Sequence, residues 1–303
     1  MAYTEYGEPQ SLQLKDLPTP KLGPGEVLIR AERASVNPVD WKLMSGALDP
    51  MMDTFFPVIP GWDVAGVVEA VGPDVPEFSS GDRVASYARK DFVQGGTYAQ
   101  YVSVRADDVA PIPEGVTFET AAALPLAGLT ALRTLETLRI TASDTLLIHA
   151  ASGGVGHLAG QLAVELGARV IGTASEANHQ RLREFGLEPV TYGDGLSERV
   201  RQIAPDGVTA VADLVGGVVE QSEAVLNQTG RFASIADPTA AERGGHWVWV
   251  RPDGARLKTL LEKSAHGRLR VDIDTTYPLE QAARALEHNQ RGACGKILID
   301  TTA

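Results

Sequence analysis

Residues 146–156 read LLIHAASGGVG, and this segment decides the fold. The apolar start predicts a strand, and the glycines stand where apolar residues begin to recur at helical spacing, up to Gly167. A glycine-rich turn between a strand and a helix lets the backbone approach a pyrophosphate, whose charge meets free N–H groups at the start of the helix. The pattern departs from the usual fingerprint at Ala151, which replaces its first glycine, so a turn without a ligand remains the alternative. We predict that this loop binds a dinucleotide cofactor.

The next predicted strand, residues 169–173, indicates which nicotinamide cofactor fits. NAD-specific folds place an acidic residue near its end to hold the ribose 2′-hydroxyl, whereas Ser175 stands here. A carboxylate about 4 Å from a 2′-phosphate would cost about 4 kcal/mol at an effective dielectric constant of about 20. Serine avoids this repulsion, and His179, one helical turn later, offers a further donor, which favours NADP(H). Two alternatives stay open: Glu176 could turn inward to bind a 2′-hydroxyl, and His179 could be a solvated residue on the helix surface.

Strands and helices alternate from residue 120 to residue 264, which is typical of a doubly wound parallel sheet. Residues 1–119 instead read as short strands joined by Gly/Pro turns, and residues 265–303 add a strand at 269–273, a helix and a last strand. A short apolar strand is also predicted at residues 247–250. The predicted fold class is therefore α/β, with a Rossmann-type sheet and a smaller, mostly β domain.

The composition excludes several classes of partner. The 303 residues include 27 Lys and Arg against 39 Asp and Glu, and a net charge of −12 argues against binding to nucleic acid. The single cysteine, Cys294, allows no intrachain disulfide, which fits a reducing compartment. The longest apolar stretch, residues 121–132, is shorter than the roughly 20 residues that span a membrane. The N-terminus lacks the order of a signal peptide, so we expect a cytoplasmic protein without a membrane segment.

Several blocks resemble the quinone oxidoreductase/zeta-crystallin group, which is the zinc-independent branch of the medium-chain dehydrogenases/reductases. The resemblance runs in order along essentially the whole chain, with one departure at Val164, where the family usually carries a basic residue or serine. The matching blocks are SVNPVDWK at 35–42, PVIPGWDVAGVV at 57–68, the loop region at 143–161, GRFASI at 230–235, VRPDG at 250–254 and GKIL at 295–298.

The resemblance implies a GroES-like substrate domain, residues 1–119 completed by 265–303, and a Rossmann domain of residues 120–264. It places Ser175 at the 2′-phosphate, and His179 where a lysine often stands. It also places five loop residues at the pyrophosphate: Ser152, Gly153, Gly154, Val155 and Gly156. It also places Tyr192 near the adenosine phosphate, although a surface-loop aromatic is the alternative. Further residues would lie near the nicotinamide or its ribose: Asn37, Thr130, Leu214, Val215, Ile235, Ala236, Trp249 and Val250.

The residues that would bind a catalytic zinc in related dehydrogenases are missing. Their Gly-His-Glu block reads Gly61-Trp62-Asp63 here, and no cysteine or histidine lies within residues 1–119. We therefore expect a metal-free reaction: hydride transfer from NADPH to a quinone or an α,β-unsaturated carbonyl, which delocalises charge as hydride arrives. The alternatives are an enoyl-thioester reductase and an NADPH-binding protein with little turnover. No catalytic group is identified, and the candidates for the substrate cleft are Asn37, Asp40, Trp41, Trp62 and Thr130.

Two of these expectations have a structural alternative. Asp40 could cap a helix that starts near Trp41, and Asn37 could be a turn residue before Pro38. The family also implies a homodimer, joined through the edge strand at residues 247–250. Pairing with a second copy would cover the exposed edge of that strand. The alternative is that its tryptophans face inward.

Overall fold

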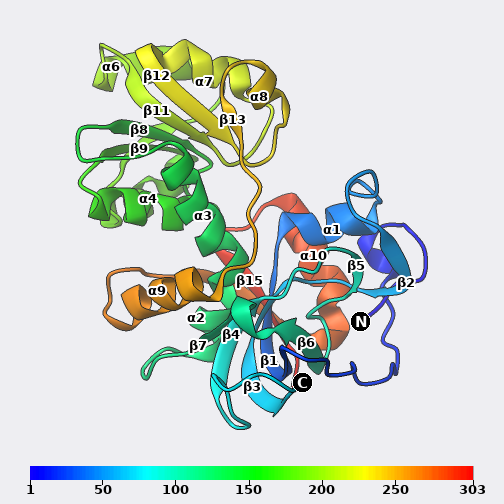
Figure 1. Ribbon diagram of the computed structural model, residues 1–303. Helices are drawn as coiled ribbons and strands as arrows, with labels where there is room; N and C mark the ends of the chain where they lie inside the picture. Colours follow the sequence, from blue (N-terminus) through cyan, green and yellow to red (C-terminus); the bar gives the residue numbers. More distant parts are fainter. Residues whose placement is uncertain (303) are drawn as a thin grey trace. The chain divides into compact units, whose positions relative to one another are not determined.

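The computed structural model describes residues 1–302 and divides into two compact units (Figure 1). One unit contains residues 1–129 and the residues from 251 onward, and the other is Thr130–Val250. The sequence placed these boundaries at about 120 and 265. They differ because α2 (Phe118–Ala123) packs on the strands of the first unit, and α9 (Gly254–Ala265) packs on its strand β7 (Val109–Pro111).

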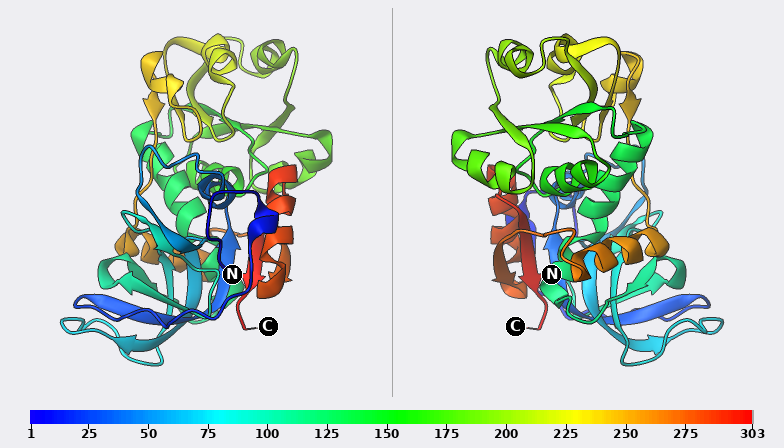
Figure 2. Two further views of the ribbon diagram at one scale, coloured as in Figure 1. Left: turned by 90° about the vertical axis from the view of Figure 1, so that its right-hand side faces the viewer. Right: turned by 90° about the vertical axis from the view of Figure 1, so that its left-hand side faces the viewer.

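The first unit is built on a seven-stranded sheet in the order β14-β15-β1-β3-β4-β7, with β6 also paired to β1. The last strand, red in Figure 2, runs antiparallel to β1 and aligns Ile297 with Val36, so both ends of the chain form one sheet. Buried apolar side chains, including Val27, Ile29 and Val64, form a hydrophobic core on this sheet. The other strands and helices are β1 (Glu26–Val36), β2 (Thr54–Ile59), β3 (Asp63–Val71), β4 (Arg83–Tyr87), β5 (Val93–Gly95), β6 (Tyr101–Arg105), β14 (Ile273–Pro278), β15 (Lys296–Asp300), α1 (Pro38–Met44) and α10 (Ala282–Arg291).

The second unit is a six-stranded parallel sheet in the order β10-β9-β8-β11-β12-β13. This order confirms the predicted doubly wound Rossmann sheet, in which β8 lies between β9 and β11. Its elements are β8 (Thr145–His149), α4 (Gly156–Glu165), β9 (Arg169–Ala174), α5 (His179–Glu184), β10 (Glu188–Thr191), α6 (Leu196–Ile203), β11 (Val208–Asp213), α7 (Val219–Val225), β12 (Leu226–Ser234), α8 (Thr239–Glu242) and β13 (His246–Trp247).

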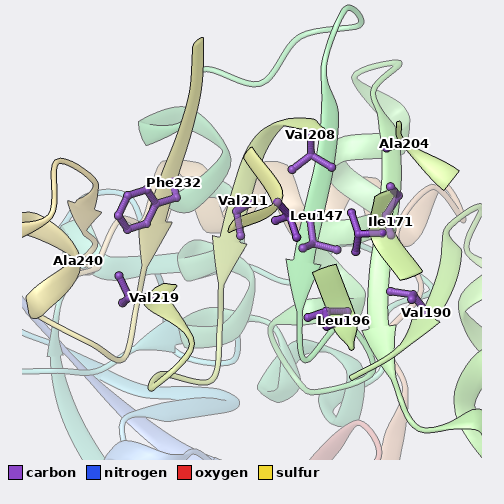
Figure 3. Packing of buried hydrophobic residues seen from close by; sticks show 12 residues of the cluster. Leu147, Ile171, Val190, Leu196, Ala204, Val208, Val211, Val219, Phe232 and Ala240 are labelled. Atoms are coloured by element: carbon purple, nitrogen blue, oxygen red, sulfur yellow. The ribbon is translucent and has the colours of Figure 1, made fainter. Parts of the chain in front are cut away.

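Apolar side chains from four neighbouring strands cover one face of this second sheet (Figure 3). Leu147, Ile171, Val211 and Phe232 come from β8, β9, β11 and β12, and all are buried. They pack with residues of the helices that follow the strands, such as Val219 of α7. Burial of these apolar side chains holds the parallel strands in place. The loops at the carboxyl ends of the strands are positioned with them.

Two predicted elements differ from the structure. Before them, residues 118–137 form two helices, α2 and α3 (Pro125–Thr137), because Pro125 has no N–H to continue the helical hydrogen bonds. The strand expected at 269–273 starts at Ile273, where it first pairs with Lys296 of β15. The edge strand expected at 247–250 has only the two residues of β13, since the second unit ends at Val250 and the chain returns to the first.

Candidate cofactor and acceptor sites

The loop after β8 is tied to the neighbouring strand β9 by two hydrogen bonds. The N–H of Ala150, which has a left-handed φ of 55°, donates to Thr173 Oγ1 at 3.0 Å. The N–H of Ala151 donates to the carbonyl oxygen of Thr173 at 2.9 Å. The methyl group of Ala151 is fully buried, and a Cβ added at Gly172 would lie 2.7 Å from it. The alanine in the first fingerprint position therefore fits because a glycine stands opposite it on β9.

The predicted phosphate-binding residues have two different roles. A Cβ at Gly156 would lie 2.3 Å from the carbonyl oxygen of Ala150, so this glycine lets α4 begin close against the loop. A Cβ at Gly153 would approach only that same oxygen, at 3.3 Å. Among residues 1–302, the N–H groups of Gly154 and Val155 donate to no backbone or side-chain acceptor. These half-buried groups at the start of α4 are suited to an anion.

The end of β9 presents hydroxyl and imidazole groups. Ser175 is half-buried, and its Oγ accepts from Asn178 Nδ2 at 3.1 Å, which leaves the hydroxyl proton free to donate. Glu176 is exposed. His179 begins α5, and its Nε2 is buried with no hydrogen-bond partner among the described residues. A buried, unpaired nitrogen differs from the solvated histidine that the sequence left as an alternative.

The structure adds a cation that the sequence did not single out. Arg181 of α5 donates from Nη1 to the carbonyl oxygen of Ser152 at 3.3 Å. Its guanidinium also lies 5.8 Å from the ring centroid of Phe185. Arg181 and Arg183 are both in this short helix, and only the three-dimensional fold shows that the first of them reaches the phosphate loop.

The loops after β11 and β12 are held together by a buried pair of polar side chains. Asp213 Oδ1 accepts the N–H groups of Val215 at 2.9 Å and Gly216 at 2.8 Å, while its Oδ2 accepts from Ser234 Oγ at 2.7 Å. Ser234 Oγ accepts in turn from the N–H of Ala236 at 3.2 Å. This pair orients the four residues that the family resemblance places near the nicotinamide: Leu214, Val215, Ile235 and Ala236.

The remaining predicted residues of the second unit lie in different surroundings. Tyr192 is 59% exposed just after β10, as in the surface-loop alternative. Thr130 is buried in α3, and its Oγ1 has no hydrogen-bond partner among the described residues. Trp247 and Trp249 stack edge to face at 5.9 Å and are partly exposed, whereas Val248 between them is buried. Val250 is half-buried and closes this unit.

In the first unit, Asn37 and Asp40 form a capping box at the start of α1. Asp40 Oδ2 accepts the N–H of Asn37 at 2.8 Å and the hydroxyl of Tyr98 at 2.8 Å. Asp40 and Tyr98 are fully buried. The capping role that the sequence allowed for Asp40 is therefore present, since its carboxyl group accepts the N–H of Asn37 at the helix start.

A buried lysine completes this cluster. Lys296 Nζ donates to Asn37 Oδ1 at 2.5 Å and lies 3.7 Å from Asp63 Oδ2. Asn37 Nδ2 donates to the same carboxylate oxygen at 2.8 Å, so its amide is held on both sides. Burial raises the pKa of Asp63 and lowers the pKa of Lys296. The missed signal is a lysine directly before the buried apolar run Ile297–Ile299 of β15.

The two tryptophans proposed for the substrate cleft differ in what they contact. The indole of Trp41 donates to Asn289 Oδ1 of α10 at 3.1 Å, which commits its polar edge to packing between helices. Trp62 is 5% exposed and meets Tyr87 edge to face at 6.0 Å. Trp62 also lines a small cavity of the first unit.

The protonation state of Asp40 leads to a prediction about stability. Burial raises its pKa from 3.8 to about 7, so the folded protein holds this proton more tightly than the unfolded chain does. The free energy of unfolding should therefore fall as pH rises from about 4 to about 7, by up to about 4 kcal/mol at 1.36 kcal/mol per pH unit. Asp40→Asn keeps an oxygen for Asn37 and Tyr98 but has no proton to lose.

We therefore expect the free energy of unfolding of Asp40→Asn to rise relative to that of the unmodified protein between pH 4 and pH 8. Urea unfolding of both proteins at these two pH values measures this change. Asp63, Lys296 and Tyr98 are common to both proteins, so their titration cancels in the comparison. If the difference in the free energy of unfolding between the two proteins stays constant across this pH range, the pKa of Asp40 is not raised.

Comparison with known proteins identifies the family. The alcohol dehydrogenase GroES-like domain matches residues 23–114, and the zinc-binding dehydrogenase domain matches residues 186–299. The quinone oxidoreductase of Sus scrofa is 31% identical over 97% of this chain and 95% of its own. The chain belongs to the quinone oxidoreductase branch of the medium-chain dehydrogenases/reductases. Like that family, it is an oxidoreductase that uses a nicotinamide cofactor and a small-molecule substrate.

Two further relatives support this assignment. The solved structure of the quinone oxidoreductase from Coxiella burnetii superposes with a TM-score of 0.89 and 33% identity, covering 99% of this chain and 98% of that one. A chloroplastic NADPH-dependent alkenal/one oxidoreductase of Arabidopsis thaliana is 29% identical over 98% of this chain and 78% of its own. None of the helices within residues 1–302 is long and apolar enough to cross a membrane.

The zinc in the name of the second family does not fit the residues present. Asn37 uses its amide oxygen and nitrogen on Lys296 and Asp63, and the indole of Trp62 offers no lone pair to a metal. Across residues 1–302 no group of three or more His, Cys, Asp or Glu side chains could hold a metal ion. The residues present therefore fit a reaction that needs no metal ligands.

Proposed function

We propose that this protein transfers a hydride from NADPH to the conjugated carbonyl system of a quinone or an α,β-unsaturated ketone or aldehyde. The choice of NADPH rests on the residue at the end of β9. Ser175 stands there in place of the acidic residue of NAD-specific folds, and its hydroxyl can donate a hydrogen bond. The names of the quinone and alkenal/one oxidoreductase relatives support the choice of acceptor.

The residues of the second unit fit a phosphorylated dinucleotide. The unpaired N–H groups of Gly154 and Val155 would hold the pyrophosphate, and Ser175 would donate to the 2′-phosphate. His179 adds an imidazole nitrogen without a protein partner, although its neighbour Glu176 is acidic. When bound, the nicotinamide would supply the hydride, and the chain itself would bind and orient the cofactor.

Absorbance at the NADPH band tests the activity. Purified protein is mixed with NADPH or NADH and a panel of quinones, 2-enones, 2-enals, saturated ketones and enoyl thioesters. We expect oxidation of NADPH with quinones, enones and enals. Turnover confined to enoyl thioesters, or tight NADPH binding without turnover on any acceptor, would instead support the alternatives from the sequence.

Ser175→Asp should weaken NADPH binding much more than NADH binding. The new carboxylate would stand close to the 2′-phosphate, and repulsion of about 4 kcal/mol per unit charge at about 4 Å corresponds to a loss of roughly 10³ in affinity. NADH lacks this phosphate and should lose little. Isothermal titration with both cofactors measures the ratio, and Ser80→Asp, an exposed change in the first unit, controls for the added charge. An equal loss for both cofactors would show that Ser175 does not contact the phosphate.

We also propose a cytoplasmic homodimer that pairs the two edge strands β13. The N–H of Val248 donates to Ser234 O of its own sheet at 2.8 Å, so the outward backbone groups belong to Trp247 and Trp249. Both indoles are partly exposed, at 39% and 38%, and a second copy would cover them. Sedimentation velocity on the unmodified protein tests the proposal, and a monomer at micromolar concentration contradicts it.

A further inference from the structure

A fully buried histidine, to which the proposed function gives no role, reaches back to the phosphate loop. His157 lies in the first turn of α4, and its ring Nδ1 is 2.9 Å from the carbonyl oxygen of Gly153. A carbonyl oxygen can only accept, so Nδ1 carries a proton and donates this hydrogen bond. The backbone N–H of His157 donates to the same oxygen at 3.2 Å. One residue therefore holds the carbonyl of Gly153 with two donors.

The direction of this carbonyl sets the direction of an N–H group at the predicted pyrophosphate site. The C=O of Gly153 and the N–H of Gly154 belong to one trans peptide unit, so they point in opposite directions. Because the carbonyl is turned into α4 toward His157, the N–H of Gly154 is directed out of the start of the helix. Among residues 1–302 that N–H donates to no acceptor, and it is one of the two groups suited to an anion.

The preceding peptide unit of the loop is held at both of its polar ends. The carbonyl oxygen of Ser152 accepts from Arg181 Nη1 at 3.3 Å, and the N–H of Gly153 donates to Ala150 O at 3.0 Å. The backbone that leads from β8 into the site is therefore fixed up to Gly153. His157 fixes the next unit, whose N–H group faces the site.

A buried aromatic side chain supports both of these donors. Phe185 follows α5 and is 8% exposed. Its ring centroid lies 6.0 Å from that of His157, and the guanidinium of Arg181 lies 5.8 Å from the same ring. A fully buried imidazole packed in this way cannot turn without losing contacts, so its Nδ1–H stays directed at Gly153.

We propose that His157 is a positioning residue for the cofactor: its Nδ1–H holds the carbonyl of Gly153 so that the N–H of Gly154 faces the pyrophosphate. This inference rests on the dinucleotide binding of the proposed function and adds a residue to it. The pyrophosphate is common to NADPH and NADH, so His157 should contribute equally to the binding of both. This equal effect distinguishes His157 from Ser175, which is proposed to act on the 2′-phosphate alone.

Two variants at His157 separate the hydrogen bond from the packing of the ring. His157→Phe keeps a flat ring against Phe185 but has no donor, whereas His157→Asn loses the ring and keeps an N–H near the position of Nδ1. We expect His157→Phe to bind NADPH and NADH each about 10-fold more weakly, and His157→Asn to keep most of the affinity. The control is His266→Phe, because His266 Nδ1 makes the same contact with Glu262 O, at 2.6 Å, at the exposed end of α9. It should bind both cofactors as the unmodified protein does.

Ligands that lack part of the cofactor give a readout that a merely structural role would not. Adenosine 2′-monophosphate has the 2′-phosphate but no pyrophosphate, so His157→Phe should bind it as tightly as the unmodified protein does. ADP-ribose has the pyrophosphate but no nicotinamide, and its affinity should fall by about the same 10-fold. Isothermal titration measures each ligand, and thermal unfolding checks that the variants are folded.

The outcomes separate this inference from the proposed function. If His157→Phe binds NADPH, NADH and ADP-ribose as tightly as the unmodified protein does, the inference is wrong and the proposed function stands. A loss of affinity for adenosine 2′-monophosphate as well, or a loss in His157→Asn but not in His157→Phe, would assign the effect to packing and overturn the inference. If the unmodified protein reduces no acceptor, the proposed function is wrong, and the ADP-ribose titrations still decide the inference. Absence of ADP-ribose binding to the unmodified protein also overturns it.

Discussion

Replacing Lys296 by methionine is expected to lower the free energy of unfolding by about 3–5 kcal/mol, as is typical when one partner of a buried ion pair is removed. The ammonium is 3% exposed, donates to Asn37 Oδ1, and lies 3.7 Å from Asp63 Oδ2, which is fully buried. Without it, the carboxylate keeps hydrogen bonds from Leu126 N–H and Asn37 Nδ2 but loses its counter-charge. Urea unfolding at pH 7 measures the loss.

A compensating variant distinguishes charge from packing. In the double variant Lys296→Met with Asp63→Asn no charge is left in this pair, and we expect much of the lost stability to return. If the loss came only from the missing hydrogen bond to Asn37 and from altered packing, the second change would restore nothing. That result would contradict the role assigned to the pair of charges. Ser80→Asp, at an exposed position, should leave stability within the usual small range of surface changes.

Local sequence patterns were sufficient to predict the Rossmann sheet. The apolar run LLIH and the helical spacing after it are short-range features of the sequence. Strands that are buried on both faces of a parallel sheet consist of such apolar runs. The family resemblance to residues 57–68 and 295–298 supplied the GroES-like domain, and the antiparallel pairing of Val36 with Ile297 then accounts for the joining of the two chain ends. The fold was therefore predictable almost in full.

The polar clusters were less predictable, because they depend on contacts between distant segments. Lys296 meets Asn37 across 259 positions of the chain, and no periodicity in either segment indicates this contact. The length of β13 also depended on where the chain leaves the second unit, and this could not be read from apolar residues alone.

Gly153→Val is expected to abolish cofactor binding in a protein that still folds. The added Cβ would have only Ala150 O within 4 Å, at 3.3 Å, so a small adjustment admits it without displacing β8 or α4. The branched side chain would, however, occupy the half-buried surface of the loop, next to the free N–H groups of Gly154 and Val155. A pyrophosphate needs close backbone approach at this point. Isothermal titration with NADPH measures the affinity, and circular dichroism reports the fold.

Gly156→Val is the matched control, with the opposite expected result. Its Cβ would lie 2.3 Å from Ala150 O and 2.7 Å from Ala151 Cα, which are backbone atoms of the loop itself and cannot move independently of it. This variant should therefore lose stability as well as binding, because the start of α4 is forced away from β8. If Gly153→Val binds NADPH as tightly as the unmodified protein does, its glycine serves neither packing nor the pyrophosphate.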